Sequence, residues 1–284
     1  MSGRLAEIGA RIDGIGQLGM VVNAMRGIAA ARAQQARGQL AAVDAHAALI
    51  AGAIGRALSL AAGTSLPLGR TKGRPVLVLF CAEQGFAGTF NEKILEAVAG
   101  EAAGADLFLV GSRGISLARE RGFHPRWTKA MPAHSPSLPK LAEIIVSTLE
   151  GPIAAGEVSR LDVVFAIWRP GGGTQLQRNT LLPFDYGRFP VSSAPAPLVQ
   201  MKPDDLLAAL AGDYVHAQLC AAALHAFAAE NEARMEAMAN ARSQIERQLG
   251  ELQATRRRIR QEEITAEIIE LSAGEMAAEE AFQG

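Results

Sequence analysis

The densest cluster of charged side chains lies near the carboxyl end of the chain, in the run ATRRRIRQEEITAEIIE at 254–270. If this run is helical, pairs four residues apart, such as Arg258 and Glu262, stabilise it on a solvated face. The same groups can also bind a partner, because guanidinium groups make two-pronged contacts with carboxylates. Composition alone favours the solvated face, and both interpretations stay open at this point. A block of arginines is followed within two turns by a block of glutamates: Arg256, Arg257, Arg258, Arg260, Glu262, Glu263, Glu267 and Glu270.

A glycine-containing turn, AEQGFAGTFN at 82–91, is the main candidate for phosphate binding. Gly85 and Gly88 leave room for a phosphate close to backbone N–H groups. However, the turn lacks the dinucleotide-binding spacing GxGxxG, and the pattern GxxxxGK[ST] is absent from the chain. A tight turn between a strand and a helix is therefore the simpler interpretation, and the glycines at 171–173 are most simply a loop.

Side chains for acid–base, nucleophilic or metal chemistry are not grouped in the sequence. Neither HExxH nor GxSxG occurs, and no pair of acids stands out as a general acid and base. Cys81 and Cys220 lack CxxC or metal-ligand spacing, which indicates buried free thiols. We therefore expect no catalytic residue, no metal site and no bound cofactor. The histidines are scattered, at His46, His124, His134, His216 and His225.

The composition excludes some classes of protein. The net charge of −1 gives no support to a nucleic-acid partner. Hydrophobic residues make up 49% of the chain and aromatic residues only 5%, which suits close packing of helices rich in alanine and leucine. No signal peptide is evident, and the longest uncharged helical stretch, 214–229, is too short and too polar to span a bilayer. We therefore expect a soluble protein made in the cytoplasm.

Both ends of the chain have the apolar pattern of long helices. Steps of three and four residues separate the apolar positions of the first segment, and the last segment has the same spacing. Helices of this length need a partner, so we expect the two ends to form an antiparallel coiled coil. Glycines in the first helix favour a closely approaching backbone or a narrow surrounding sleeve. The predicted seam contains Leu5, Ile8, Ile12, Ile15, Val22, Met25 and Ile28, and then Met235, Met238, Ile245, Leu249, Leu252, Ile259, Ile264, Ile268 and Leu271.

The middle of the chain alternates apolar strand-length runs with amphipathic segments, which predicts an inserted, Rossmann-like α/β domain with a mostly parallel sheet. The expected domains are a first coiled-coil helix over 1–62, the α/β domain over 63–202 and a second coiled-coil helix over 203–284. We expect strands at 76–81, 106–112, 162–168 and 175–183, helices at 91–99, 116–121 and 137–150, a Gly/Pro loop at 63–75, a proline-rich linker at 183–203 and a frayed tail after about Ala273.

Four motifs in order resemble the gamma subunits of F-type ATP synthases over nearly the whole chain. They are NAMRGIAAARAQQAR at 23–37, AEQGFAGTFN at 82–91, VGSRG at 110–114 and RQEEITAEIIELSAG at 260–274. The last of these is the most specific. The resemblance implies a non-catalytic rotor shaft that couples ion flow through the membrane sector to ATP synthesis or hydrolysis, and it favours the docking interpretation of the charged block.

The resemblance also implies partners and contact residues. The expected partners are the alpha and beta subunits of the catalytic hexamer, the epsilon subunit and the c-subunit ring, at the cytoplasmic face of the bacterial cell membrane. Motif positions imply that beta-subunit contact and coupling involve Met25, Arg260, Gln261, Thr265, Glu267 and Glu270.

Departures from the family pattern indicate a divergent branch. Glu83 and Gln84 replace the usual Asp-Arg, Ala87 replaces a cysteine, and Asn23 replaces a lysine. The coupled ion, proton or sodium, is left open by these residues. Two alternatives remain at this stage: a stand-alone coiled-coil scaffold with an α/β binding head, and an enzyme that uses the inserted domain.

Overall fold

The computed structural model describes residues 2–60, 73–189 and 198–282. The chain forms two compact units, Met1–Gly27 with Ala237–Gly284, and Ile28–Glu236. Two long helices, α1 (Ser2–Leu60) and α5 (Pro203–Phe282), each contribute residues to both units. Most of the expected loop at 63–75 and part of the proline-rich linker lie outside the described residues.

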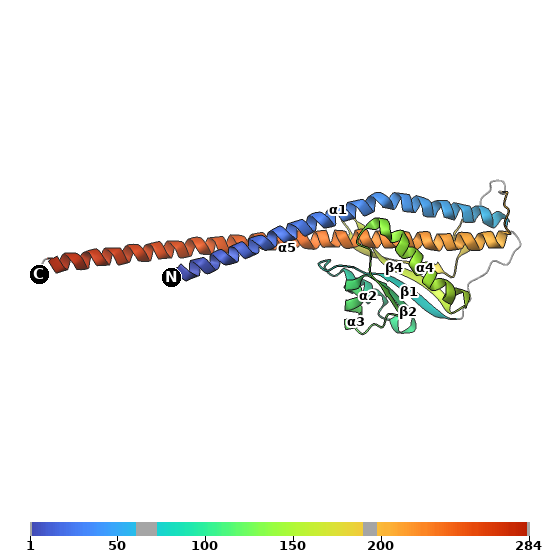
Figure 1. Ribbon diagram of the computed structural model, residues 1–284, viewed down its shortest axis with the longest axis horizontal. Coiled ribbons are helices and arrows are strands. Elements are labelled where there is room, and N and C mark those ends of the chain that lie inside the picture. The colour runs from blue at the N-terminus through green and yellow to red at the C-terminus, as the bar shows by residue number, and fades with distance from the viewer. Residues whose placement is uncertain (1, 61–72, 190–197, 283–284) are drawn as a thin grey trace. The chain divides into compact units, whose positions relative to one another are not determined.

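The first unit is an antiparallel pair of helices, formed by the first turns of α1 and the second half of α5 (Figure 1). Val22, Met238 and Ile245 form its buried core, and Ile15 and Leu249 pack against them. The Arg242 Nη1–H group donates to Asn23 Oδ1 at 3.1 Å, which fixes the register at the surface. The predicted coiled coil is therefore present, and these five apolar residues belong to the predicted seam.

The seam is shorter than the sequence pattern suggests. Ile28 is exposed, and so are Ile264, Ile268 and Leu271. The residue pairing explains the carboxyl-terminal part of this difference. Because Asn23 faces Arg242, the same register places Ser2 opposite about residue 263 of α5. Beyond that point no described residue of α1 faces α5, and Ile264, Ile268 and Leu271 are exposed.

Glycines of α1 are not required by the packing of the two helices. A Cβ atom built on Gly9, Gly14, Gly16 or Gly27 meets nothing within 4 Å, and on Gly19 it meets only Ile245 Cγ2 at 3.4 Å. The expectation of a close backbone approach within this chain is therefore wrong. The alternative reason for the glycines, a narrow surrounding sleeve, stays a prediction.

Replacing glycine by alanine should therefore stabilise the chain. We expect Gly14→Ala and Gly27→Ala together to raise the free energy of unfolding by about 1–2 kcal/mol, because each glycine costs roughly 0.5–1 kcal/mol in a helix interior. Urea denaturation of the purified full chain measures this. Gly111→Ala is the contrasting control, because its backbone is strained for other residues at φ 105° and its added Cβ would lie 2.3 Å from the Cys81 carbonyl oxygen. If the double variant Gly14→Ala, Gly27→Ala were less stable than the parent, these two positions would be packed against other residues.

The second unit is built on a five-stranded sheet with the order β3-β2-β1-β4-β5. Strands β1 to β4 are parallel and β5 is antiparallel to β4, so the expectation of a mostly parallel sheet is confirmed. The strands are β1 (Arg74–Phe80), β2 (Asp106–Val110), β3 (Trp127–Lys129), β4 (Val158–Arg169) and β5 (Gly173–Leu182).

Helices cover both faces of this sheet. On one face, α4 (Leu138–Ala154) and the first half of α5 pack on alternate strand residues such as Val78 and Val163. On the other face, α2 (Phe90–Val98) and α3 (Ser112–Glu120) pack on the residues between them, such as Leu79 and Val164. Strands β1 and β2 thus have buried apolar residues on both sides, as the uninterrupted run VLVLFC indicates for β1.

Four details differ from the sequence-based expectation. Strand β3 was not predicted, because three residues carry too little pattern. Helix α3 begins at Ser112, four residues earlier than expected, directly after Gly111, whose φ of 105° favours glycine. Strand β4 is longer than expected. Helix α5 extends to Phe282 instead of fraying after Ala273, since the last turns consist of helix-forming Ala, Glu and Met.

The thiols of Cys81 and Cys220 are free and buried, as predicted. Burial, assisted by the nearby Glu230 charge, raises the pKa of Cys81 to about 12. Burial likewise raises the pKa of Cys220 to about 11. Both groups therefore stay in the unreactive thiol form at neutral pH.

A buried carboxylate joins β4 to the edge strand β5. The Asp162 side chain is fully buried and accepts hydrogen bonds from Arg160 Nε at 3.0 Å and Thr180 Oγ1 at 2.7 Å, and it forms an ion pair with Arg178. Arg178 also pairs with Glu101, beside the helical layer. Burial raises the pKa of Asp162, but the hydrogen bonds from Arg178, Thr180 and Arg160 outweigh burial, so the pKa lies below its ordinary value.

Removing this charge should weaken the fold. We expect Asp162→Asn to lower the free energy of unfolding at pH 7 by about 1–3 kcal/mol, because buried donors lose a charged acceptor. The pKa of Asp162 is lower in the folded chain than its ordinary value of 3.8. The carboxylate therefore stabilises the fold fully above pH 3.8, and this stabilisation is lost as the pH falls through the folded-state pKa. The difference between parent and variant in urea denaturation should therefore shrink in strongly acidic solution. Glu143→Gln, on the exposed face of α4, is the control and should change stability by less than about 0.5 kcal/mol.

Candidate functional site

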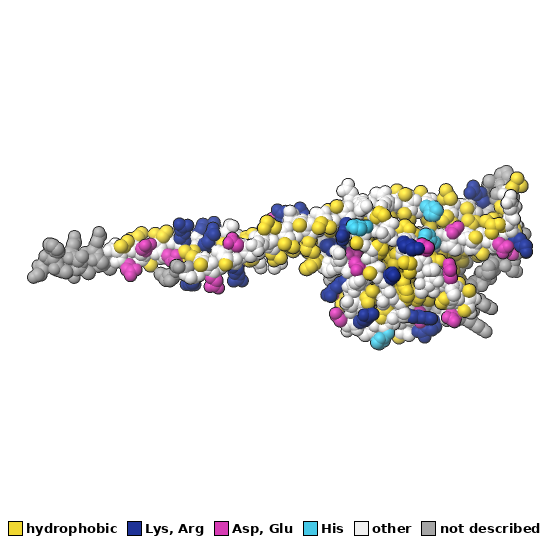
Figure 2. Space-filling model, viewed as in Figure 1, with side chains coloured by type: hydrophobic (Ala, Val, Ile, Leu, Met, Phe, Trp, Pro, Cys, Tyr) yellow, Lys and Arg dark blue, Asp and Glu magenta, His cyan; other side chains and the backbone are white. Residues whose placement is uncertain are grey.

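The charged block predicted to contact a partner lies on the solvated surface of α5, in the first unit. Arg260, Gln261, Thr265, Glu267 and Glu270 are all exposed. Along this stretch Figure 2 shows basic and acidic side chains interleaved with apolar ones. The structure therefore brings these five predicted residues together on a single helix, and it leaves their side chains available to a partner.

Contacts within the block are weak. Arg258 Nε lies 3.8 Å from Glu262 Oε1, and both side chains are more than 60% exposed, so this pair contributes little to stability. The Thr265 Oγ1–H group donates to the Gln261 carbonyl at 2.8 Å, within the helix itself. Ile259, which lies within the block, is buried. The block thus sits where the paired part of α5 ends and its unpaired part begins.

Met25 does not belong to this group. It is half-buried on α1 and packs against the core formed by Val22, Met238 and Ile245. The register of the two helices places it opposite about residue 240, roughly 20 residues or about 30 Å along the helix from Arg260. Its predicted contact with a beta subunit stays a prediction, at a level separate from the charged block.

A second polar site, in the other unit, attaches the turn after β1 to α5. Glu230 of α5 accepts hydrogen bonds from the backbone N–H groups of Glu83 and Gln84, both at 3.2 Å. Arg234, one turn further along, donates to the carbonyl oxygens of Gln84 and Gly85 at 3.1 Å each, and it pairs with Glu230. We call Glu230, Arg234 and the turn 83–85 the turn clamp.

The turn clamp is almost fully withdrawn from water. The side chains of Glu230 and Arg234 are 4% and 5% exposed. Burial raises the pKa of Glu230, while Arg234 and the two backbone N–H groups oppose that rise. Asn231 completes the network, since its Oδ1 accepts from Arg234 at 3.1 Å and its Nδ2–H donates to the Phe227 carbonyl at 2.8 Å.

The Glu83 side chain, which belongs to the same turn, binds groups outside the turn. It accepts hydrogen bonds from Ser112 N–H and Ser112 Oγ–H at 2.8 Å each, at the amino end of α3, and from Met131 N–H at 2.7 Å. The N–H groups near the turn that point to an anion are therefore satisfied by carboxylates of the chain itself. A phosphate would meet two negative charges here, so the simpler interpretation of AEQGFAGTFN as a tight turn is supported.

Sequence reasoning missed Glu230, Asn231 and Arg234. A signal was available: ENEAR at 230–234 follows an alanine-rich stretch without Asp, Glu, Lys or Arg, and Glu230 and Arg234 are four residues apart. Their partner, the turn at 83–85, is about 150 residues away in sequence. The spacing of residues within one segment does not predict a contact between segments so far apart in the sequence.

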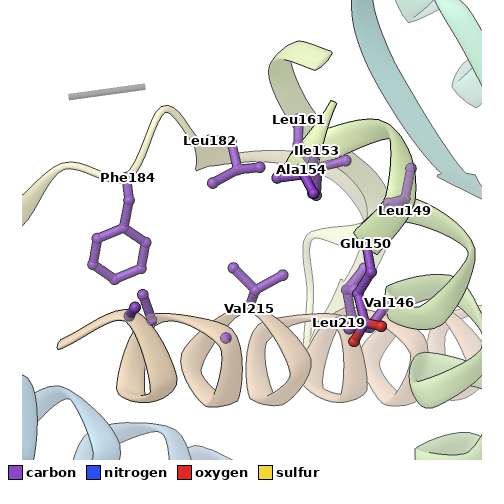
Figure 3. A pocket seen from close by; sticks show the side chains of 13 residues that line it. Val146, Leu149, Glu150, Ile153, Ala154, Leu161, Leu182, Phe184, Val215 and Leu219 are labelled. Atoms are coloured by element: carbon purple, nitrogen blue, oxygen red, sulfur yellow. The ribbon is translucent and has the colours of Figure 1, made fainter. Parts of the chain in front are cut away.

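An apolar cavity of about 320 Å³ lies between α4, the end of β5 and the first turns of α5 (Figure 3). Leu182, Phe184 and Val215 surround it, and Glu150 supplies its one charged lining residue. Among the described residues no group of three or more His, Cys, Asp or Glu side chains is placed to hold a metal ion. Neither feature offers the paired groups that acid–base or metal-assisted catalysis requires.

Helices α1 and α5 also contain stretches that are long and apolar enough to cross a membrane, by length and composition only. Core helices of folded domains meet the same criterion. In the second unit, apolar side chains of α5 such as Leu219, Ala222, Ala223 and Phe227 belong to the core of the folded domain.

A protein-family model described as ATP synthase matches residues 4–278. The chain belongs to the ATP synthase family. It is 27% identical to an ATP synthase gamma chain of Chlorobium luteolum and 29% identical to one of Chlorobium limicola, in each case over 95% of this chain and 97% of the relative. The predicted resemblance to gamma subunits is confirmed, and with it the role of the chain in the central stalk of an F-type ATP synthase.

Solved structures of ATP synthases share the fold. A chain of the Euglena gracilis mitochondrial ATP synthase, in a structure of OSCP, F1 and the c-ring, matches with a TM-score of 0.72 at 14% identity and covers 100% of this chain and 97% of its own length. A chain of the Tetrahymena thermophila central stalk and c-ring matches with a TM-score of 0.58 at 18% identity, over 78% of this chain and 99% of its own. The fold of long terminal helices around a mostly parallel sheet is therefore that of ATP synthase central stalks.

Removing one of the two charged side chains of the turn clamp should destabilise the contact between the turn 83–85 and α5. We expect Arg234→Ala to lower the free energy of unfolding by about 3–5 kcal/mol, because it leaves the Glu230 charge buried without its partner. Replacing both charges, in Glu230→Gln with Arg234→Met, should cost less than the single change. Arg258→Ala removes an exposed i,i+4 pair on the same helix and should cost no more than about 0.5 kcal/mol. Equal losses for Arg234→Ala and Arg258→Ala in urea denaturation would contradict the assignment.

Proposed function

We propose that this central-stalk chain acts as a non-catalytic rotor, and that the charged block of α5 is its coupling contact with a beta subunit. The observation that carries the proposal is the exposed charged block at the point where α5 loses its α1 partner. A helix end that carries both charges and uncovered apolar residues is typical of a surface that a partner covers. The residues of this contact are Arg260, Gln261, Thr265, Glu267 and Glu270.

Differential contact explains how one chain can influence several identical subunits. A single asymmetric helix presents different side chains to each subunit of a surrounding ring. Because a bound element shifts a conformational equilibrium only by its difference in binding free energy between states, the contacts must form with one subunit state and break with another. The weak internal pairing of Arg258 and Glu262 at 3.8 Å leaves these charges free to exchange partners.

The remaining partners and the location follow from the same proposal. The alpha and beta subunits surround the α1–α5 pair, while the epsilon subunit and the c-subunit ring bind the inserted α/β domain. The complex is attached to the membrane, and the chain faces the cytoplasm without entering the bilayer. Met25, which is half-buried on α1, is proposed as a further beta-subunit contact, at a level separate from the charged block.

Removing the arginine and glutamine should uncouple the complex without unfolding the chain. In the reconstituted complex, we expect Arg260→Ala with Gln261→Ala to reduce ATP-driven ion pumping roughly tenfold, because a hydrogen bond to a charged group contributes about 1.5–3 kcal/mol. Both side chains are exposed, so the unfolding midpoint of the isolated full chain should not change.

The same helix offers a matched control. Arg247 and Gln248 form a second exposed arginine–glutamine pair, on the part of α5 that faces α1. Arg247→Ala with Gln248→Ala should change pumping by less than twofold. Unchanged pumping in the first double variant, or equal losses in both, would show that the coupling contact lies elsewhere.

A further inference from the structure

A basic pocket of about 580 Å³ opens at the amino-terminal edge of the sheet. Arg74 is the first residue of β1, Asp106 is the first residue of β2, and Arg126 directly precedes β3. Because these three strands are parallel neighbours in the order β3-β2-β1, their starts lie side by side. Arg121 and His124, in the loop after α3, line the same pocket.

One carboxylate holds two of the guanidinium groups in place. The Arg74 Nε–H group donates to Asp106 Oδ1 at 3.0 Å, and Arg126 Nη1 pairs with the other oxygen, Oδ2. Arg74 Nη2 also reaches the Ala103 carbonyl at 3.4 Å. A guanidinium group has five N–H donors, so these contacts leave donors of both arginines for a further acceptor. The side chains are 58% and 54% exposed, so they are accessible to a ligand.

Positive charge exceeds negative charge in this pocket. Three arginines line it against the one carboxylate of Asp106. Arg121 is only loosely paired, with its Nη1 atom 3.7 Å from Glu96 Oε1. A concave surface with an excess of one sign concentrates ligands of the opposite sign. Guanidinium groups oriented by a shared carboxylate are suited to bidentate contact with phosphate oxygens.

The rest of the lining is small and apolar. Alanines at 99, 102, 103 and 105 form part of the wall with Phe123. Small side chains keep the pocket open, and the volume is of the size that holds a small organic molecule rather than a single ion. We propose that this pocket binds an organic phosphate that carries at least two negative charges, through Arg74, Arg121 and Arg126.

The opposite edge of the sheet makes a useful contrast. Ligands of open α/β sheets usually bind at the carboxyl ends of the strands. Here the turn after β1 is filled by the carboxylates of Glu83 and Glu230, which repel anions. The amino-terminal edge, with its three arginines, is therefore the edge where an anion is attracted. This proposal is independent of the coupling contact on α5, so either can fail alone.

Isothermal titration of the isolated full chain tests the proposal, because no other nucleotide-binding subunit is then present. The probes are pyrophosphate and ADP, with adenosine as the uncharged control. We expect one saturable site per chain for both anions, weaker binding at high salt, and none for adenosine. Absence of saturable binding of pyrophosphate and ADP would overturn the proposal.

Variants assign the binding to the pocket. Arg121→Ala should weaken pyrophosphate binding at least tenfold, and it leaves both contacts of Asp106 intact, so folding is not at risk. Arg126→Lys keeps the charge but loses the two-pronged geometry, and should weaken binding at least threefold. Arg113→Ala, on the exposed surface of α3 and outside the pocket, is the matched control and should change binding by less than twofold. Equal weakening by Arg113→Ala and Arg121→Ala would overturn the proposal.

A competition experiment identifies the source of the phosphate. Phosphatidylcholine vesicles that contain phosphatidic acid, whose phosphomonoester can carry two negative charges, are compared with vesicles of phosphatidylcholine alone, and each is added to the chain with bound pyrophosphate. Displacement only by the anionic vesicles assigns the phosphate to a lipid headgroup. Retention of pyrophosphate with both kinds of vesicle assigns it to a soluble organic phosphate.

Discussion

The burial of Glu230 beside Arg234 is the constraint on which the attachment of the sheet to α5 depends. Two charges without water are unfavourable unless their hydrogen bonds are satisfied, and here backbone groups of the turn 83–85 satisfy them from the other side. A shift of α5 by one residue would turn the pair by about 100° and leave both charges buried without partners. The contact therefore selects one register of the helix against the sheet, which apolar packing on alanine alone would not do.

The elements that cover α5 differ along its length, and the pattern of its apolar side chains changes with them. In the second unit its side chains from Ala217 to Arg234 are almost all buried, since the sheet and α1 cover it. In the first unit only α1 faces it, and one stripe that includes Met238 and Ile245 is enough. Past about residue 263, Ile264, Ile268 and Leu271 are exposed, and none of the helices and strands that the structure describes covers them. From its amino end to its carboxyl end, α5 thus first packs in the core of the second unit, then pairs with α1 in the coiled coil, and then has an exposed surface.

Much of this arrangement can be predicted from the sequence, for physical reasons that are local. Helical spacing of Ile15, Val22 and Leu249 predicts the coiled coil, and the unbroken apolar run before Cys81 predicts a strand covered on both faces. The contacts that could not be predicted join distant segments, such as Glu230 with the turn after β1. The seam beyond Ile259 was predicted too long, because periodicity shows that a face is apolar but not which element covers it. The charged block was identified, whereas its partner is a property of another chain.

The sheet has four parallel strands and one antiparallel edge strand, so its two borders differ. Strand β5 is attached to β4 by the buried Asp162, which accepts hydrogen bonds from Arg178 and Thr180. At the other side, β3 is only three residues long and offers few free backbone groups.

The glycines of α1 have a consequence of a different kind. At Gly9, Gly14, Gly16 and Gly27 an added Cβ would touch no described residue, so the helix is narrower there on faces that point away from α5. Each glycine costs helix stability without improving the packing of this chain. If a sleeve of other subunits surrounds the helix, as predicted, the reduced diameter would give it clearance to turn.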